Sequence, residues 1–177
     1  MRLSPVSIAK WVEKSRAAGP GKPPLHHEGF WEDGFLVKLF DGPTPRGRRD
    51  FHVNTSPEFF YQLEGEMRCR LRHADAAFED IVVGVGEMFL IPAGMPHLNE
   101  RDEGSIGLVI HEARKPGALD GIVWFCESCG GELHRVDYRF EELQRQLRTF
   151  IREFLSSETL RTCGRCGAVT APDQGFM

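Results

Sequence analysis

The chain has 177 residues, 41% of them hydrophobic and 27% charged, and a formal net charge of −4. This composition is typical of a soluble protein with one domain, or one domain and a small appendage, and the charge gives no general attraction to nucleic acid or to an anionic membrane. The N-terminal segment is too polar for a signal peptide and no stretch is long enough for a transmembrane helix, so we expect a cytoplasmic protein without nucleic-acid or membrane partners.

The order of the predicted elements divides the chain into two parts. Residues 1–20 predict a short amphipathic helix with Ile8, Trp11 and Val12 on one face. Short strand-like runs separated by turns follow, namely FLVKLF, EFFYQLEGEMRCRLRH, FEDIVVGVGEMFLIPAG and IGLVIHE; they favour an antiparallel sandwich or small barrel. The pattern then changes to a cysteine pair, a helix over FEELQRQLRTFIREFLSSETL and a second cysteine pair. We therefore expect two domains, residues 1–120 and 121–177.

One strand-like run ends in a stiff turn that leads directly to a histidine. The turn, PAGMP, contains two prolines and one glycine, and His97 follows it. Upstream, His52 and Glu58 stand on either side of a second turn, NTSP. Two imidazoles and one carboxylate can form the facial triad that binds Fe(II) and leaves positions open for substrate and oxygen. Taken singly, each of these residues is more often an ordinary surface or turn residue.

Two spaced patterns around these residues resemble the motifs of the cupin family. Residues 52–65 read H-x-N-x-x-x-E-x-x-x-x-x-x-G, and residues 86–97 read G-x-x-x-x-x-P-x-G-x-x-H. The first pattern departs once, because Asn54 stands where many cupins have a second histidine. The resemblance implies a mainly β, jelly-roll barrel (a double-stranded β-helix), here with a short N-terminal helix and a C-terminal helix and metal ribbon. The metal ligands that it implies are His52, Glu58 and His97.

Four of the five cysteines form two C-x-x-C-G knuckles with 33 residues between them. In a chain of this kind such cysteines fit metal ligands better than disulfides. Two knuckles predict a closed tetrathiolate site for Fe or Zn, made of Cys126, Cys129, Cys163 and Cys166. The fifth cysteine, Cys69, lies in a predicted strand and is expected to be a core thiol.

A cupin followed by such a ribbon resembles the bacterial 3-hydroxyanthranilate 3,4-dioxygenases. The resemblance covers nearly the whole chain and includes KPP, EFFYQLEG, LVI, LDGIVWFCESCG, HRV and CGRCG. It implies that Fe(II) and O2 open the ring of 3-hydroxyanthranilate to 2-amino-3-carboxymuconate semialdehyde, which closes to quinolinate without enzyme help. The pathway implied is tryptophan and kynurenine catabolism with quinolinate biosynthesis. The resemblance further implies a homodimer and a second metal, Fe or Zn, that lies in the ribbon and takes no part in catalysis.

The resemblance also assigns roles near the metal. Arg48 and Arg101 match arginines that contact the substrate, and an arginine is well shaped to bind a carboxylate with paired hydrogen bonds. His111 stands where the family has the glutamate that handles the substrate hydroxyl proton, and Glu112 follows it. Alternating strand geometry allows only one of these two to face inward, unless a bulge intervenes. The catalytic residues expected are therefore Arg48, Arg101, His111 and Glu112.

Three positions near the site differ from the family pattern. His27 replaces an asparagine that helps to close over the substrate, His111 replaces the glutamate, and Asn54 replaces an aspartate. The substrate-binding residues expected are Arg48, Arg101, His27, Glu58 and His111. The changes leave open a related aminohydroxybenzoate or a substituted hydroxyanthranilate as the substrate. They could also be harmless drift.

Two other classes of function remain open. A ligand-binding cupin without enzymatic activity, or a regulator whose ribbon binds nucleic acid, would call for a basic face on residues 121–177. The charges there are mixed. A metal-dependent cupin isomerase or decarboxylase would need no oxygen, and it gives no reason for the arginines beside the predicted ligands.

Overall fold

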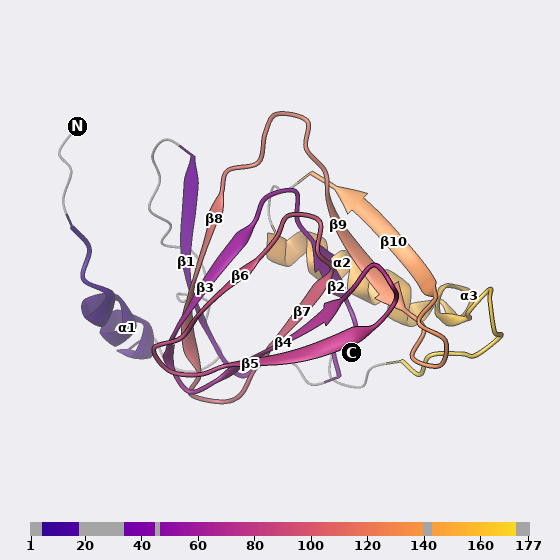
Figure 1. Cartoon of the computed structure of the whole chain (residues 1–177), viewed down its shortest axis with the longest axis horizontal. Helices are drawn as coiled ribbons and strands as arrows, with labels where there is room; N and C mark the ends of the chain where they lie inside the picture. Colours follow the sequence, from indigo (N-terminus) through magenta and orange to yellow (C-terminus); the bar gives the residue numbers. More distant parts are fainter. Residues whose placement is uncertain (1–4, 18–33, 45–46, 140–142, 173–177) are drawn as a thin grey trace.

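The structure is a computed structural model and describes residues 5–17, 34–44, 47–139 and 143–172. Two antiparallel sheets face each other (Figure 1). The four-stranded sheet has the order β1 (Phe35–Asp41), β8 (Ile106–Glu112), β3 (Glu58–Glu64) and β6 (Met88–Ile91). The six-stranded sheet has the order β10 (Glu132–Tyr138), β9 (Asp120–Phe125), β2 (Phe51–Val53), β7 (His97–Arg101), β4 (Met67–Arg72) and β5 (Phe78–Val83).

The strand order identifies the fold. β1-β8-β3-β6 in one sheet and β2-β7-β4-β5 in the other interleave the first and second halves of the eight strands, as the two Greek keys of a jelly roll do. β9 and β10 extend the second sheet beyond β2. The predicted mainly β, cupin-type barrel is therefore confirmed. Because β9 begins at Asp120, the second sheet continues through the point where the sequence suggested a domain boundary, and that boundary stays a prediction.

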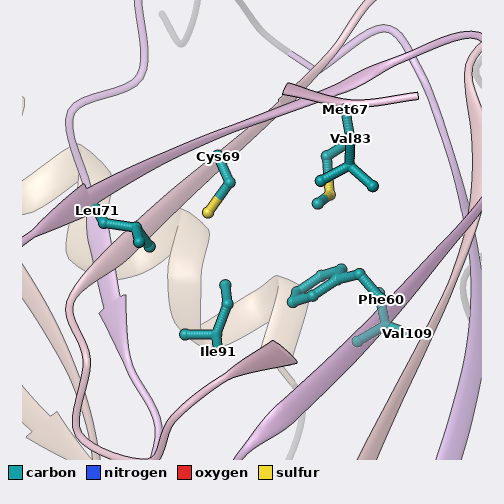
Figure 2. Close-up of a cluster of buried hydrophobic side chains, with 7 residues drawn as sticks. All are labelled: Phe60, Met67, Cys69, Leu71, Val83, Ile91 and Val109. Carbon is teal, nitrogen blue, oxygen red and sulfur yellow. The ribbon is translucent and has the colours of Figure 1, made fainter. Parts of the chain in front are cut away.

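The barrel interior is filled by apolar side chains from both sheets. Figure 2 shows these side chains pointing toward one another across the space between the sheets. Cys69 is fully buried among them, as predicted, and burial raises the pKa of its thiol to about 12. The buried members of this cluster are Phe60, Met67, Cys69, Leu71, Val83, Ile91 and Val109. They occupy one part of the interior, and the polar side chains described below occupy another.

Helices cover the two ends of the molecule (Figure 1). The predicted N-terminal helix is α1 (Ile8–Ala17), which buries Trp11 and Val12 against Leu39 of β1, whereas Ile8 is exposed. At the other end lie α2 (Leu143–Ser156) and α3 (Glu158–Arg161). Phe154 of α2 stacks on Trp124 of β9, with ring centroids 4.5 Å apart and an angle of 11° between the planes. None of the helices in the described ranges has the length and apolar character that a membrane crossing requires.

The observed strands differ from the predicted ones in an informative way. Strands β3, β4, β5, β6 and β8 lie within the predicted apolar runs, and β1 extends one residue beyond its run, to Asp41. No strand was predicted at β2, β7, β9 or β10. β2 has only three residues, β7 reads HLNER, and β10 contains a register shift between Glu132 and His134. None of these three strands therefore shows a long alternation of apolar and polar residues. Phe140, predicted at the start of the C-terminal helix, lies outside the described residues.

Candidate functional site

The stiff turn before His97 controls the orientation of its imidazole. Gly94 has φ +78°, and its N–H donates to the carbonyl of Asn54 at 2.8 Å, which ties the turn to the end of β2. The carbonyl of Met95 lies 2.9 Å from His97 Nδ1. Because a carbonyl can only accept, Nδ1 carries a hydrogen and Nε2 is the atom that faces the interior.

The three predicted metal ligands lie at neighbouring positions of the two sheets. His52 of β2 is directly opposite His97 of β7, and the ring centroids are 5.9 Å apart. Glu58, the first residue of β3, places Oε2 3.1 Å from His97 Nε2. Burial opposes ionisation of Glu58, but the hydrogen bond with His97 and the charges of the nearby histidines lower its pKa to about 2. Glu58 is therefore a carboxylate near neutral pH.

His52 is held by an arginine and a fully buried aspartate. Arg48 donates from Nη2 to His52 Nε2 at 3.1 Å, so the Nε2 lone pair of this histidine faces the guanidinium. Arg48 also binds both carboxylate oxygens of Asp50, at 3.0 and 2.5 Å. Burial works against the charge on Asp50, but Arg48 and His52 hold the pKa of this carboxyl well below its usual range. Burial lowers the pKa of His52, which favours the neutral imidazole.

These residues fit a divalent metal by the chemistry of their donors. The Nε2 lone pair of His52 is the form that binds metals, and the Nδ1–H of His97 is held by a carbonyl, as in most metal-binding histidines. Nε2 of His97 donates to the Glu58 carboxylate, and a metal ion would have to replace this hydrogen. Glu58 supplies a carboxylate beside them. The three donor atoms do not converge as tightly as the cysteine sulfurs described below, because Nε2 of His52 is directed at Arg48.

Arg101 offers an unsatisfied donor inside the barrel. It lies on β7 opposite Met67, which belongs to the interior cluster, and it is 6% exposed. Its guanidinium contacts the sulfur of Met67 at 3.0 Å and lies 5.5 Å from the ring centroid of Phe40, but its buried Nε–H has no hydrogen-bond partner in the described part of the chain. Burial lowers the pKa of Arg101 to about 10, so it stays a cation at neutral pH. Such a donor suits a ligand carboxylate.

The two residues after the LVI run point in opposite directions. His111 of β8 is directly opposite Glu58 of β3, and directly opposed residues of an antiparallel pair project from the same face. His111 is 4% exposed, whereas Glu112 is exposed on the other face. Burial and the neighbouring Arg114 lower the pKa of His111 to about 4. His111 therefore lies with Glu58 inside the barrel, and Glu112 lies apart from them.

Sequence reasoning missed several charged residues of this region. Lys38 of β1 is 5% exposed and shares the inward face with Leu36, which lies opposite His111; burial and Arg114 lower its pKa to about 8. Its signal in the sequence was a lysine inside the apolar run FLVKLF. Asp50 could have been found because it precedes His52 by two positions, which places both on one face of a strand. His27 lies outside the described residues.

The four predicted ribbon cysteines come together as a compact cluster. All four sulfurs lie within 4.8 Å of one another, with 3.7 Å between Cys126 and Cys166 and 3.5 Å between Cys129 and Cys163. A tetrahedral site with Zn–S bonds of about 2.3 Å requires sulfurs about 3.8 Å apart. These separations therefore suit a single ion.

The two cysteine knuckles repeat the same backbone hydrogen bonds. In the first, the Gly130 N–H donates to the Cys126 carbonyl, and in the second the Gly167 N–H donates to the Cys163 carbonyl, both at 2.8 Å. Gly130 and Gly167 have φ of +67° and +74°, a conformation that favours glycine. Backbone N–H groups of Cys166 and Arg165 lower the pKa of the Cys163 thiol to about 6, which favours the thiolate that a metal binds.

The chain is similar to known proteins over nearly its whole length. The chain is 37% identical over 175 residues to a 3-hydroxyanthranilate 3,4-dioxygenase of Xanthomonas campestris pv. campestris (strain 8004), covering 98% of this chain and 97% of that protein. It is 34% identical over 174 residues to the protein of the same name in Bacillus thuringiensis (strain Al Hakam), covering 98% and 95%. Protein NMB1881 from Neisseria meningitidis matches with a TM-score of 0.46 and 20% identity over 63% of this chain and all of that one. The model of the family described as 3-hydroxyanthranilic acid dioxygenase matches residues 1–155, and the chain belongs to this family.

Proposed function

We propose that this protein is an O2-dependent, ring-cleaving dioxygenase that acts on 3-hydroxyanthranilate. Membership of the family and the names of the two relatives support the reaction class. The observation that carries the proposal in this chain is the placement of His52, Glu58 and His97 at adjoining positions of β2, β3 and β7. These are the donors that an Fe(II) site with open positions needs.

The residues around this triad have separate tasks. Arg101, through its unsatisfied Nε–H, binds the substrate carboxylate and orients the ring. Burial and the charge of Arg48 favour the neutral His52 imidazole, and Asp50 holds the Arg48 guanidinium against its Nε2. Iron, when bound by His52, Glu58 and His97, supplies the oxygen chemistry that side chains alone cannot provide. The apolar cluster of the barrel keeps bulk water away from this end of the interior.

The finer assignments belong to the same proposal. The product is 2-amino-3-carboxymuconate semialdehyde, the precursor of quinolinate, which places the reaction in tryptophan catabolism. The cysteine cluster holds a structural Fe or Zn ion, and its sulfur separations support this assignment.

We propose that the protein is a cytoplasmic homodimer and that its two domains divide near residue 120. A related aminohydroxybenzoate or a substituted hydroxyanthranilate is the second candidate substrate, which the inward-facing His111 favours.

Oxygen uptake tests the proposal directly. The Fe(II)-loaded protein should consume O2 with 3-hydroxyanthranilate and form a product that converts to quinolinate. The panel should include plain 2-aminophenol, which lacks the carboxylate that Arg101 binds, and isomeric aminohydroxybenzoates. Oxygen uptake with an isomer but not with 3-hydroxyanthranilate would transfer the proposal to that substrate. No uptake with any member of the panel would contradict the reaction class.

A further inference from the structure

The orientation of His111 is set by Arg114. Arg114 Nη1 contacts His111 Nδ1, and a guanidinium carries only N–H donors. The Nδ1 atom must therefore accept, and the hydrogen of the neutral imidazole lies on Nε2. His111 is thus a fixed donor through Nε2, in the position where the family pattern has a carboxylate, which can only accept.

Arg114 is itself held in place by a fully buried carboxylate. Its Nε and Nη2 both lie 2.8 Å from Oδ2 of Asp120, which is 0% exposed. The other carboxylate oxygen, Oδ1, accepts from the N–H and the hydroxyl of Thr55 at 2.9 and 3.0 Å. Asp120 begins β9 and Thr55 follows β2, so the guanidinium is anchored to the second sheet. A guanidinium held on this side has little freedom to turn away from His111.

A second nitrogen donor lies on the same wall. Lys38 of β1 is diagonal to His111, because Leu36 is opposite His111 and Lys38 is opposite Val109. Diagonal neighbours on one face of a sheet are about 7–8 Å apart, within reach of a long side chain. Val109 belongs to the interior cluster, so this face of β1 and β8 is the inner one. The wall therefore carries Lys38 and His111 as donors beside the Glu58 carboxylate, which lies opposite His111, and the exposed Glu112 is not part of it.

We propose that Lys38 and His111, the latter oriented by Arg114, form a donor wall that binds the ring oxygen of the substrate in its ionised form. This inference rests on the proposed function. A phenol has a pKa near 10 in water, so free 3-hydroxyanthranilate carries its hydroxyl proton at pH 7. When the O–H bond breaks on binding, the electron pair stays on the oxygen, the two donors stabilise that charge, and the proton passes to solvent. Arg114 acts as a positioning residue and does not touch the substrate.

Proton release on binding, compared between the parent chain and variants that lack one of the two donors, tests this. Calorimetric titration of the Fe(II)-loaded full chain with 3-hydroxyanthranilate, without oxygen and at pH 7, is repeated in buffers of different ionisation enthalpy. We expect about one proton released per bound substrate. Lys38→Met and His111→Leu should each weaken binding by roughly 10-fold, corresponding to the loss of one charge-assisted or neutral donor. His111→Gln, whose amide can still donate, should bind better than His111→Leu. Arg70→Met, which removes an exposed arginine on β4, serves as the control.

A second measurement needs no substrate. Correlation of ¹⁵N-labelled histidine nitrogens with their protons in the Zn(II)-loaded full chain should show His111 protonated on Nε2 only. The signal is assigned by its absence in His111→Gln. Arg114→Met should release the tautomer, and Arg114→Lys, which keeps a donor, should restore it. His111 protonated on Nδ1 in the parent would overturn the inference, and so would substrate binding without proton release. Failure of all oxygen uptake would instead remove the proposed function, while the tautomer result would stand by itself.

Discussion

His52 and His97 face each other directly across β2 and β7, with ring centroids 5.9 Å apart, although the four strands β3 to β6 separate them in the sequence. Glu58 contacts one of them, and Arg48 and Asp50 hold the other. The pairing brings together two short motifs whose spacing along the chain says nothing of their distance in space. It also places both predicted imidazole ligands on one pair of strands, beside Glu58 of the facing sheet.

Removing an imidazole from this pair should remove the barrel metal alone. His97→Ala deletes one predicted ligand but leaves the cysteine cluster intact, so metal content should fall by about one ion per chain. Activity should fall to background. The control is His73→Ala, which removes an exposed histidine paired with Glu79 on the outer surface. Full activity with unchanged metal content in His97→Ala would refute the ligand assignment.

The cysteine cluster should contribute to stability and not to chemistry. Cys163→Ala opens the closed site, and we expect it to cost at least about 3 kcal/mol of unfolding free energy, or roughly 6–12 °C in Tm for a chain of this size. Turnover per folded, iron-loaded molecule should change little. Cys69→Ala removes a thiol that is no metal ligand and should cost less, about 1 kcal/mol. An inactive Cys163→Ala protein with unchanged Tm would contradict this assignment.

Arg101 should determine the requirement for a carboxylate on the ring. Arg101→Met removes a charge-assisted donor pair worth about 1.5–3 kcal/mol, so kcat/KM for 3-hydroxyanthranilate should fall about 10- to 100-fold. Plain 2-aminophenol should be a poor substrate of the parent and should lose little further in the variant. Arg101→Lys keeps the charge but not the planar fork, and should recover part of the loss. Equal losses for both substrates would show that Arg101 acts only through packing.

Lys38 should lower the stability of the protein at neutral pH. Its pKa of about 8 in the folded state is below its ordinary 10.5, so the unfolded chain binds the proton more tightly and stability rises with pH between these values. The full cost, up to about 3 kcal/mol, is present below pH 8. Lys38→Met should therefore stabilise the protein at pH 7, and its advantage over the parent should shrink between pH 8 and 10.5. Denaturant titrations across this range provide the measurement, and an advantage that does not vary with pH would count against a charged Lys38.

His111 should make the protein sensitive to mild acid. Its pKa of about 4 when folded lies below its ordinary 6.5, so the unfolded chain takes up a proton first as the pH falls, and stability is lost between pH 6.5 and 4. The loss assigned to this group is up to about 3 kcal/mol. His111→Gln cannot be protonated and should lose that much less stability over the same window. Unfolding curves for both proteins at several pH values would show whether the difference develops there.

The sequence predicts the motif residues better than it predicts their neighbours. His97 can be predicted from the sequence because the prolines and the glycine before it restrict the backbone. The cysteine knuckles can be predicted because their spacing repeats. β7 escapes prediction because its inward residues, His97, Asn99 and Arg101, are polar, as those of a strand lining a site must be. The contact of Arg114 with His111 and Asp120 depends on how β8 and β9 meet in space. A local sequence pattern does not predict contacts between residues of two different strands.

The interleaved strand order also constrains when the site can exist during synthesis. Within the described residues β1 pairs only with β8, and β2 lies between β7 and β9. A nascent chain that has emerged as far as Glu58 therefore has His52 but neither of the strands that neighbour β2. Pairings between such distant segments form slowly. The two imidazoles meet only after β7 has left the ribosome, and β2 gains its second neighbour only after β9 has followed. The predicted metal site is therefore complete only once β7 has emerged, and the sheet that carries its two histidines is complete on both sides of β2 only once β9 has followed.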